Sequence, residues 1–274
     1  MKKIFSLLTL LFVALIIYLA WPYQMPSFTP ERDYLDMEEQ ILEAFILAKD
    51  SSTINLPEGH FLFSQSLSLD GKKNITIKGM GMNKTVLSFK GQTQGAEGIK
   101  ITNSQNITIE DLGIEDSAGD NIKVSDTDTI TLRNIRSAWT GKVSSKNGAY
   151  ALYPVLSTYV LIEGCEAIGS SDAGIYVGQS QHVVIRNNKA FYNVAGIESE
   201  NSSHVEIYGN EAYENTSGLL IFNLPELTIY GSHVNAFQNK IYNNNIPNFG
   251  VKGSIVSAVP KGTGVVIMAT QHVE

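Results

Sequence analysis

Basic, aromatic and acidic side chains recur at one position of a repeating pattern in this 274-residue chain. Lysine can hold a sugar carboxylate, tyrosine offers a stacking face with a polar tip, and glutamate supplies a carboxylate. We therefore expect a substrate-binding surface for a polysaccharide, including one that contains uronate sugars. Its candidate residues are Lys100, Lys123, Tyr153, Tyr176 and Glu198 in one column, Glu200 on the same side, and Asp172 in the preceding turn.

Proton transfer next to a carboxylate is the chemistry that these residue types suit. In β-elimination or C5 epimerisation a base removes the proton, and a cation neutralises the charge that develops. Tyr153 or Tyr176 would be the base and Lys123 the neutralising group, so these three are the candidate catalytic residues of a lyase-like or epimerase-like enzyme. The alternative is that these side chains are exposed on a strand surface and bind no ligand. Asp120 and Asp172 are interpreted first as turn residues and second as groove-edge acids or calcium ligands.

An internal repeat must position these residues. Apolar residues that open a short strand recur, and three of their six intervals are 22 or 23 residues, while the longer intervals indicate insertions. These anchors are Ile75, Ile107, Ile130, Val160, Val183, Val205 and Val234. A second strand begins at Ile99, Ile122, Leu152, Ile175, Ile197, Leu219 and Val265. The pattern predicts an all-β, right-handed parallel β-helix of seven coils, with the candidate column facing outward.

Other repeated columns have a structural interpretation. Stacked Asn side chains can hydrogen-bond one another and the turn backbone, which predicts two ladders, Asn188, Asn210, Asn239 and Asn193, Asn215, Asn244. Cys165 lies in the first of these columns and is interpreted as a small buried hydrophobe. The alternating residues Glu110, Arg133, Glu163 and Arg186 predict cross-strand ion pairs on the outer surface.

Four of the five histidines precede an anchor, namely His182, His204, His233 and His272. Imidazoles about 5 Å apart could bind a transition metal. Asn74, Asn106, Thr129 and Tyr159 occupy the same column, which favours a polar position at the start of each strand instead. No metal or cofactor is therefore predicted.

Composition and charge exclude several classes of protein. The net charge of −7, without a Lys- or Arg-rich block, argues against nucleic-acid binding. A single cysteine rules out an intramolecular disulfide.

The N-terminus has the pattern of an export segment. Lys2 and Lys3 precede an apolar run over residues 4–20, which predicts a cleaved signal or an uncleaved inner-membrane tether within residues 1–23. Residues 24–73 are expected to form a linker, a capping helix near 33–49 and the first strand. Residues 74–274 are expected to form the repeats, incomplete at their C-terminal end. The predicted location is the periplasm or the cell surface.

Several phrases of the sequence resemble a bacterial family of exported right-handed parallel β-helix repeat proteins. They are Leu152-Tyr153-Pro154-Val155, Ser171 to Gln179, Gly196-Ile197-Glu198 and Asn223-Leu224-Pro225, and the resemblance runs from about residue 55 to the end. It implies the superfold of pectate lyases, and export, without a settled reaction. The Asp-Pro-His motif of alginate epimerases, the Asp-Asp pair of pectin hydrolases and the haem-attachment Cys-x-x-Cys-His of some relatives are absent.

Two functions remain open at this point. The first is an exported protein that binds or modifies an extended polysaccharide. The alternative is a non-catalytic envelope scaffold, a protein-interaction solenoid that assists a periplasmic maturation or redox system.

Overall fold

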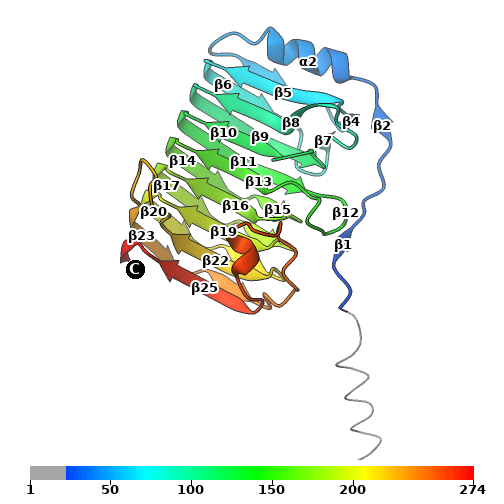
Figure 1. The fold of residues 1–274 in the computed structure, drawn as a ribbon. Coiled ribbons are helices and arrows are strands. Elements are labelled where there is room, and N and C mark those ends of the chain that lie inside the picture. The colour runs from blue at the N-terminus through cyan, green and yellow to red at the C-terminus, as the bar shows by residue number, and fades with distance from the viewer. Residues whose placement is uncertain (1–22) are drawn as a thin grey trace, which may run out of the picture.

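The computed structural model describes residues 23–274 as a parallel β-solenoid in which successive coils stack along one axis (Figure 1). The apolar run over residues 4–20 lies outside the described residues. Eight parallel strands form sheet 1, which runs in the order β5 (Gln65–Asp70), β8 (Gln94–Thr102), β10 (Ile122–Ser125), β13 (Tyr150–Val155), β16 (Ala173–Gly178), β19 (Ala195–Glu200), β22 (Ser217–Phe222) and β25 (Thr263–Met268).

Sheet 2 supplies the other faces of the coils and contains 16 strands. Its main path is β2 (Tyr34–Leu35), β4 (Gly59–Leu62), β7 (Thr85–Ser88), β9 (Gln105–Glu115), β11 (Asp128–Ala138), β14 (Thr158–Glu163), β17 (Gln181–Arg186), β20 (Ser203–Tyr208), β23 (Ser232–Phe237) and β26 (Gln271–Val273). Beside this path lie β3 (Thr53–Asn55), β6 (Lys73–Lys78), β15 (Glu166–Ile168), β18 (Lys189–Phe191), β21 (Glu211–Tyr213) and β24 (Lys240–Tyr242).

The strand register confirms the repeat. Every predicted anchor pairs with the next one, from Ile75 with Ile107 to Val205 with Val234. The second strands align in the same way, from Ile99 to Val265. The predicted number of seven coils is one too low, because Leu67 of β5 adds a strand before Ile99. A parallel ladder with an apolar residue at each inward position buries a continuous core. The apolar residues therefore recur in the sequence once per coil, which is the repeat that the sequence shows.

Both predicted Asn ladders are present. Asn188 Nδ2 donates to Asn210 Oδ1 at 3.0 Å, and Asn210 Nδ2 donates to Asn239 Oδ1 at 2.9 Å. The second ladder has the same geometry, at 3.1 and 3.0 Å. Each amide also donates to a carbonyl of the preceding coil, as Asn210 does to Ile185. Burial of these amides is therefore offset by hydrogen bonds that tie each coil to its neighbours.

Cys165 and the charged row also behave as predicted. Cys165 is buried, and burial raises the pKa of its thiol to about 12, so the thiol stays protonated. Glu163 lies between two arginines, with Oε1 2.6 Å from Arg133 Nε and Oε2 2.5 Å from Arg186 Nη2. Arg133 also reaches Glu110, at 3.6 Å. These are cross-strand ion pairs on the outer surface.

The N-terminal helix α2 (Glu38–Ile46) is shorter than the helix predicted over residues 33–49. It lies across the first coil (Figure 1), and Ile41 and Phe45 are buried in the main core. The segment before it runs beside the solenoid. There, β1 (Ser27–Phe28) pairs with β12 (Gly141–Lys142), and the buried Glu115 binds both Arg32 and Arg136. Within residues 23–274, no helix is long and apolar enough to cross a membrane.

Candidate functional site

The outward side of sheet 1 carries the predicted column. Lys100 pairs in register with Lys123, and Lys123 pairs with Tyr153. Further along, Tyr176 pairs with Glu198. Because parallel strands lie about 4.8 Å apart, these side chains form one continuous row, as expected.

The two lysines lie at the open end of this row. Lys100 Nζ and Lys123 Nζ are each 3.9 Å from Glu97 Oε1, and Lys123 Nζ lies 5.0 Å from the centre of the Tyr153 ring. The lysines are half-buried. Glu97 therefore offsets part of the positive charge that was expected to hold a sugar carboxylate.

The remainder of the row lies in a cavity of about 460 Å³. Its polar lining includes Tyr150, Tyr153, Asp172, Tyr176, Gln179, Glu198 and Glu200. Its apolar side is supplied by Phe222 and Leu224, and by Val256 in the short 3₁₀ helix η1 (Val256–Ala258). The structure thus brings five of the seven predicted binding residues together and leaves the two lysines outside the cavity.

Residues between β24 and β25 form the cover of this cavity. Val256 is buried in a small apolar cluster with Tyr176, Leu220 and Phe222. As a result, Tyr176 is 4% exposed and Glu198 is 2% exposed, so neither decorates an open strand surface. Sequence reasoning missed this cover, although the long gap between Tyr242 and Thr263 was its signal.

Three tyrosines form the floor of the cavity. The ring centres of Tyr150 and Tyr153, and of Tyr150 and Tyr176, are 4.5 Å apart, while Tyr153 and Tyr176 meet edge to face at 4.9 Å. Gly178 leaves the space that the Tyr176 hydroxyl needs, since a Cβ at this position would collide with that hydroxyl. Tyr150 was not predicted. It pairs in register with the small residue Ala173, so it was not visible as part of a repeating polar column.

Burial sets the protonation of the carboxyl groups. It raises the pKa of Asp172 to about 7, and the negative charges of Glu200 and Asp120 add to the effect. Burial also raises the pKa of Glu198 well above its usual value, assisted by Asp172 and Glu200. The pKa of Glu200 is raised by burial, against a hydrogen bond from Tyr176 that lowers it. The cavity therefore retains protons near neutral pH, and carboxyl groups that exchange protons in this range can act as general acids or bases.

The tyrosines are poorly suited to the base role expected for Tyr153 and Tyr176. Burial, followed by nearby acidic groups, raises the pKa of Tyr153 to about 12 and that of Tyr176 still further above its usual value. Both phenols stay neutral at physiological pH. They can donate hydrogen bonds and stack on a ligand, whereas the carboxyl groups of Asp172 and Glu200 are better suited to proton transfer.

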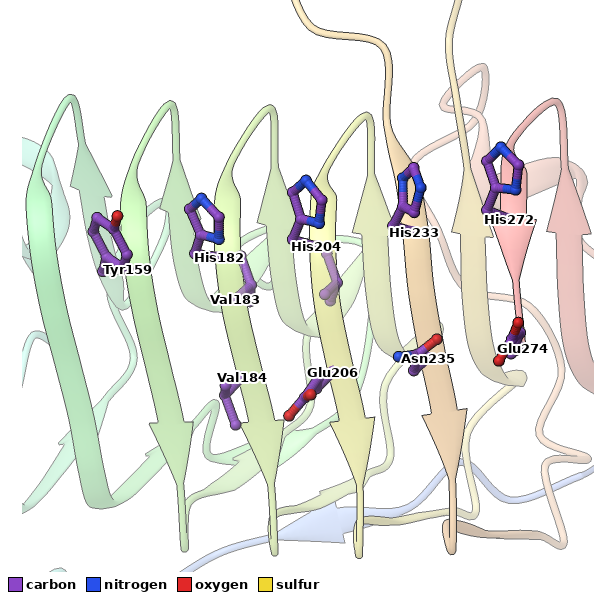
Figure 2. Close-up of a pocket in the computed structure, with 11 residues that line it drawn as sticks. Tyr159, His182, Val183, Val184, His204, Glu206, His233, Asn235, His272 and Glu274 are labelled. Atoms are coloured by element: carbon purple, nitrogen blue, oxygen red, sulfur yellow. The ribbon is translucent and has the colours of Figure 1, made fainter.

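The histidine column lies on sheet 2, away from this cavity. Figure 2 shows the imidazoles of His182, His204, His233 and His272 rising side by side from successive strands. Adjacent ring centres are 5.2, 5.1 and 4.7 Å apart, and the planes differ by at most 24°. The rings border a depression of about 690 Å³.

The backbone accounts for the residue types in the histidine column. All four histidines have φ between 52° and 58°, in the left-handed region. The other members of the column lie in the same region, with φ between 52° and 64°: Asn74, Asn106, Thr129 and Tyr159. His and Asn tolerate this region better than most residues. Two imidazole nitrogens on one tetrahedral zinc ion lie about 3.3 Å apart, whereas the centres of these nearly parallel rings are 4.7 to 5.2 Å apart. Among the described residues, no group of three or more His, Cys, Asp or Glu side chains is arranged to hold a metal ion.

Comparison with known proteins supports the fold. A sequence model of a family described as "Right handed beta helix region" matches residues 97–273. No curated protein sequence matches the chain. Among solved structures, the pre-mature gene product 12 of bacteriophage phi29 is 14% identical with a TM-score of 0.55, and the match covers 97% of this chain but only 44% of the phage protein.

Two enzymes of polysaccharide metabolism are also similar. A polygalacturonase from Erwinia carotovora ssp. carotovora is 12% identical, with a TM-score of 0.49 and coverage of 92% of this chain and 93% of the enzyme. An alginate lyase from Paenibacillus sp. str. FPU-7 is 15% identical, with a TM-score of 0.44 and coverage of 85% and 96%. At these identities the similarity concerns the fold, and the function must be argued from the cavity itself.

Proposed function

Since the chain belongs to the right-handed beta helix family, we propose that it binds an extended polysaccharide along sheet 1 and acts on it by proton transfer in the covered cavity. One observation carries the proposal: buried carboxyl groups with raised pKa values line the same cavity as three tyrosine rings. Aromatic faces bind sugars, and carboxyl groups poised near neutral pH transfer protons.

Cleavage of a glycosidic bond uses these two properties together. One carboxyl group must be protonated in order to donate to the leaving oxygen, while a second is ionised and activates water or attacks the sugar. We assign these roles to Asp172 and Glu200. Asp172 holds its proton up to about neutral pH, whereas in Glu200 the Tyr176 hydrogen bond favours the ionised form.

The other candidate residues bind the chain in this proposal. Tyr153 and Tyr176 form the stacking floor, and Glu198 lies too deep to reach a bridging oxygen, so it contacts a substituent of the sugar. Lys100 and Lys123 extend the groove along sheet 1 toward the N-terminal coils. A chain that spans several rungs would touch both ends of the row.

Incubation with a panel of neutral, acidic and amino polysaccharides tests the proposal. Reducing ends report hydrolysis, and the absorbance of unsaturated products reports β-elimination. Asp172→Asn should lower the rate about 100-fold or more, whereas the exposed Glu206→Gln on sheet 2 should leave it unchanged. If calorimetry detects no binding and no product forms with any glycan, the proposal fails. Capture of one stable protein partner from envelope extracts would then favour the scaffold alternative.

We also propose that the protein is exported, with residues 4–20 as a signal or tether. Support comes from the Lys2-Lys3 pair and the apolar run after it. Mass spectrometry of the protein from membrane and periplasmic fractions distinguishes a retained segment from a cleaved one. A full-length product in the cytosol would contradict export.

A further inference from the structure

The cavity on sheet 1 is acidic and contains no basic side chain. Its lining includes Asp172, Glu198 and Glu200, and it includes no Lys, Arg or His. Among the described ion pairs, none involves these three carboxyl groups. The two lysines of the row lie next to Glu97, and Lys123 Nζ is 5.0 Å from the centre of the Tyr153 ring.

Two carboxyl oxygens in this cavity are buried without hydrogen-bond partners, Glu198 Oε2 and Asp172 Oδ1. Glu198 is 2% exposed and belongs to the lining of the cavity, so a ligand that fills the cavity would lie beside a carboxyl group with an unpartnered oxygen. A buried polar group without a partner is costly, and a buried carboxyl group ionises only where a cation or hydrogen-bond donors compensate its charge. A ligand that brings both N–H donors and positive charge would satisfy both requirements.

The rest of the lining favours the same kind of ligand. Tyrosine rings attract a cation to their faces, and Tyr150, Tyr153 and Tyr176 all border the cavity. Phe222 and Val256 exclude water from one side, and electrostatic attraction is stronger where water is excluded. A uronate in the same place would bring a negative charge beside Glu200, the carboxyl group assigned the ionised role, and the lining contains no basic side chain to offset that charge.

We propose that the sugar bound in this cavity carries a free amino group, whose ammonium pairs with Glu198. This inference rests on the proposed polysaccharide function and names its substrate class: a glycan that contains cationic amino sugars. Glu198 is thus a specificity-determining residue, separate from the proton-transfer pair Asp172 and Glu200. The same geometry disfavours the uronate-containing glycan expected from the lysines.

Calorimetric titration with three oligosaccharides of equal length tests the inference, with glucosamine, N-acetylglucosamine and galacturonate as their units. The glucosamine oligomer should bind at least about tenfold more tightly than the N-acetylated one, because acetylation removes the charge and all but one of the N–H donors. Glu198→Gln should weaken it about 30-fold or more, while affinity for the N-acetylated oligomer should change little. Glu206→Gln on sheet 2 is the matched control.

A proton-release measurement separates recognition by Glu198 from a merely structural role. At about pH 5.5 an amine is charged, while burial raises the pKa of Glu198 well above its usual value and so favours its protonated form. Pairing should therefore release protons, seen as a dependence of the measured heat on the ionisation enthalpy of the buffer. Glu198→Gln should reduce this release. If that variant does not fold, as judged by circular dichroism, the wild type titrated with the glucosamine and the N-acetylated oligomers provides the readout, since only the charged amine should release protons.

The outcomes distinguish this inference from the function on which it rests. Equal or tighter binding of the N-acetylated or galacturonate oligomer overturns the amino-sugar inference and leaves polysaccharide binding in place. Absence of proton release in the wild type also overturns it. Absence of binding by all three oligomers and by the wider glycan panel overturns both.

Discussion

One rung of the buried Asn ladder provides a quantitative test of what holds the later coils together. Asn210 makes four side-chain hydrogen bonds of 2.9 to 3.0 Å: it donates to Ile185 O and Asn239 Oδ1, and it accepts from the backbone and side-chain nitrogens of Asn188. Asn210→Ala removes all four. At about 0.5 to 1.5 kcal/mol net for each, the free energy of unfolding should fall by about 2 to 6 kcal/mol.

Two controls make this prediction specific. Asn235 is exposed on the neighbouring strand β23, so Asn235→Ala should change stability by no more than about 0.5 kcal/mol. Arg186→Ala, which removes an outer-surface ion pair, should cost less than Asn210→Ala. Urea unfolding followed by circular dichroism measures the midpoints.

Solenoids can unfold in stages, so a local measurement is needed as well. The Asn188 amide donates to Asn210 Oδ1, and its hydrogen exchange should accelerate in Asn210→Ala. Equal midpoint shifts for Asn210→Ala and Asn235→Ala, with unchanged exchange at Asn188, would refute the account of the ladder.

Four further predictions follow from single residues. Gly178→Ala should push the Tyr176 hydroxyl out of place and weaken glycan binding about tenfold, as measured by calorimetry. His204→Asn should leave stability within about 0.5 kcal/mol in urea, whereas His204→Val should lose about 1 to 2 kcal/mol at this left-handed position. Burial raises the pKa of Asp172 from 3.8 to about 7, so the folded state binds this proton more tightly than the unfolded state does. The stability that this proton contributes is complete below about pH 4 and is lost as the pH rises through 7. The melting temperature of the wild type should fall over this range, and Asp172→Asn should remove that decline. Phe45→Ala, in the buried face of α2, should lower stability by about 3 to 5 kcal/mol in the same urea assay.

The periodic part of the fold could be read from the sequence because each coil repeats the same physical requirement. An inward residue such as Ile130 must be apolar, and a buried turn residue such as Asn210 must find partners in the next coil. Both requirements recur at the rung spacing, so they leave columns in the sequence. Strand β5 was not recognised as part of a further coil, because its pairing with β8 contains an irregularity between Gln65 and Leu67.

The candidate site could be predicted only in part, for a related reason. The outward column was visible, and the structure places Tyr153, Tyr176 and Glu198 where the register required. The cover was not visible, since Val256 belongs to an insertion with no counterpart in other coils. Burial raises the pKa values of Tyr153 and Tyr176 further above their ordinary value, so the tyrosines expected to act as bases hold their protons more tightly. No pattern within a single coil contains this information.

The position of the cavity follows from where the repeat is interrupted. A regular solenoid repeats the same strand spacing at every rung, and this spacing alone cannot single out one sugar in a long chain. The interruptions break this symmetry at one level of the solenoid: the insertion containing Val256 closes over β16 and β19, and Gly178 makes room for one tyrosine. The regular rungs on either side would still bind a polymer without fixing its position. Substrate choice should therefore depend on the covered rungs, and exchanging the insertion should alter specificity while leaving the solenoid intact.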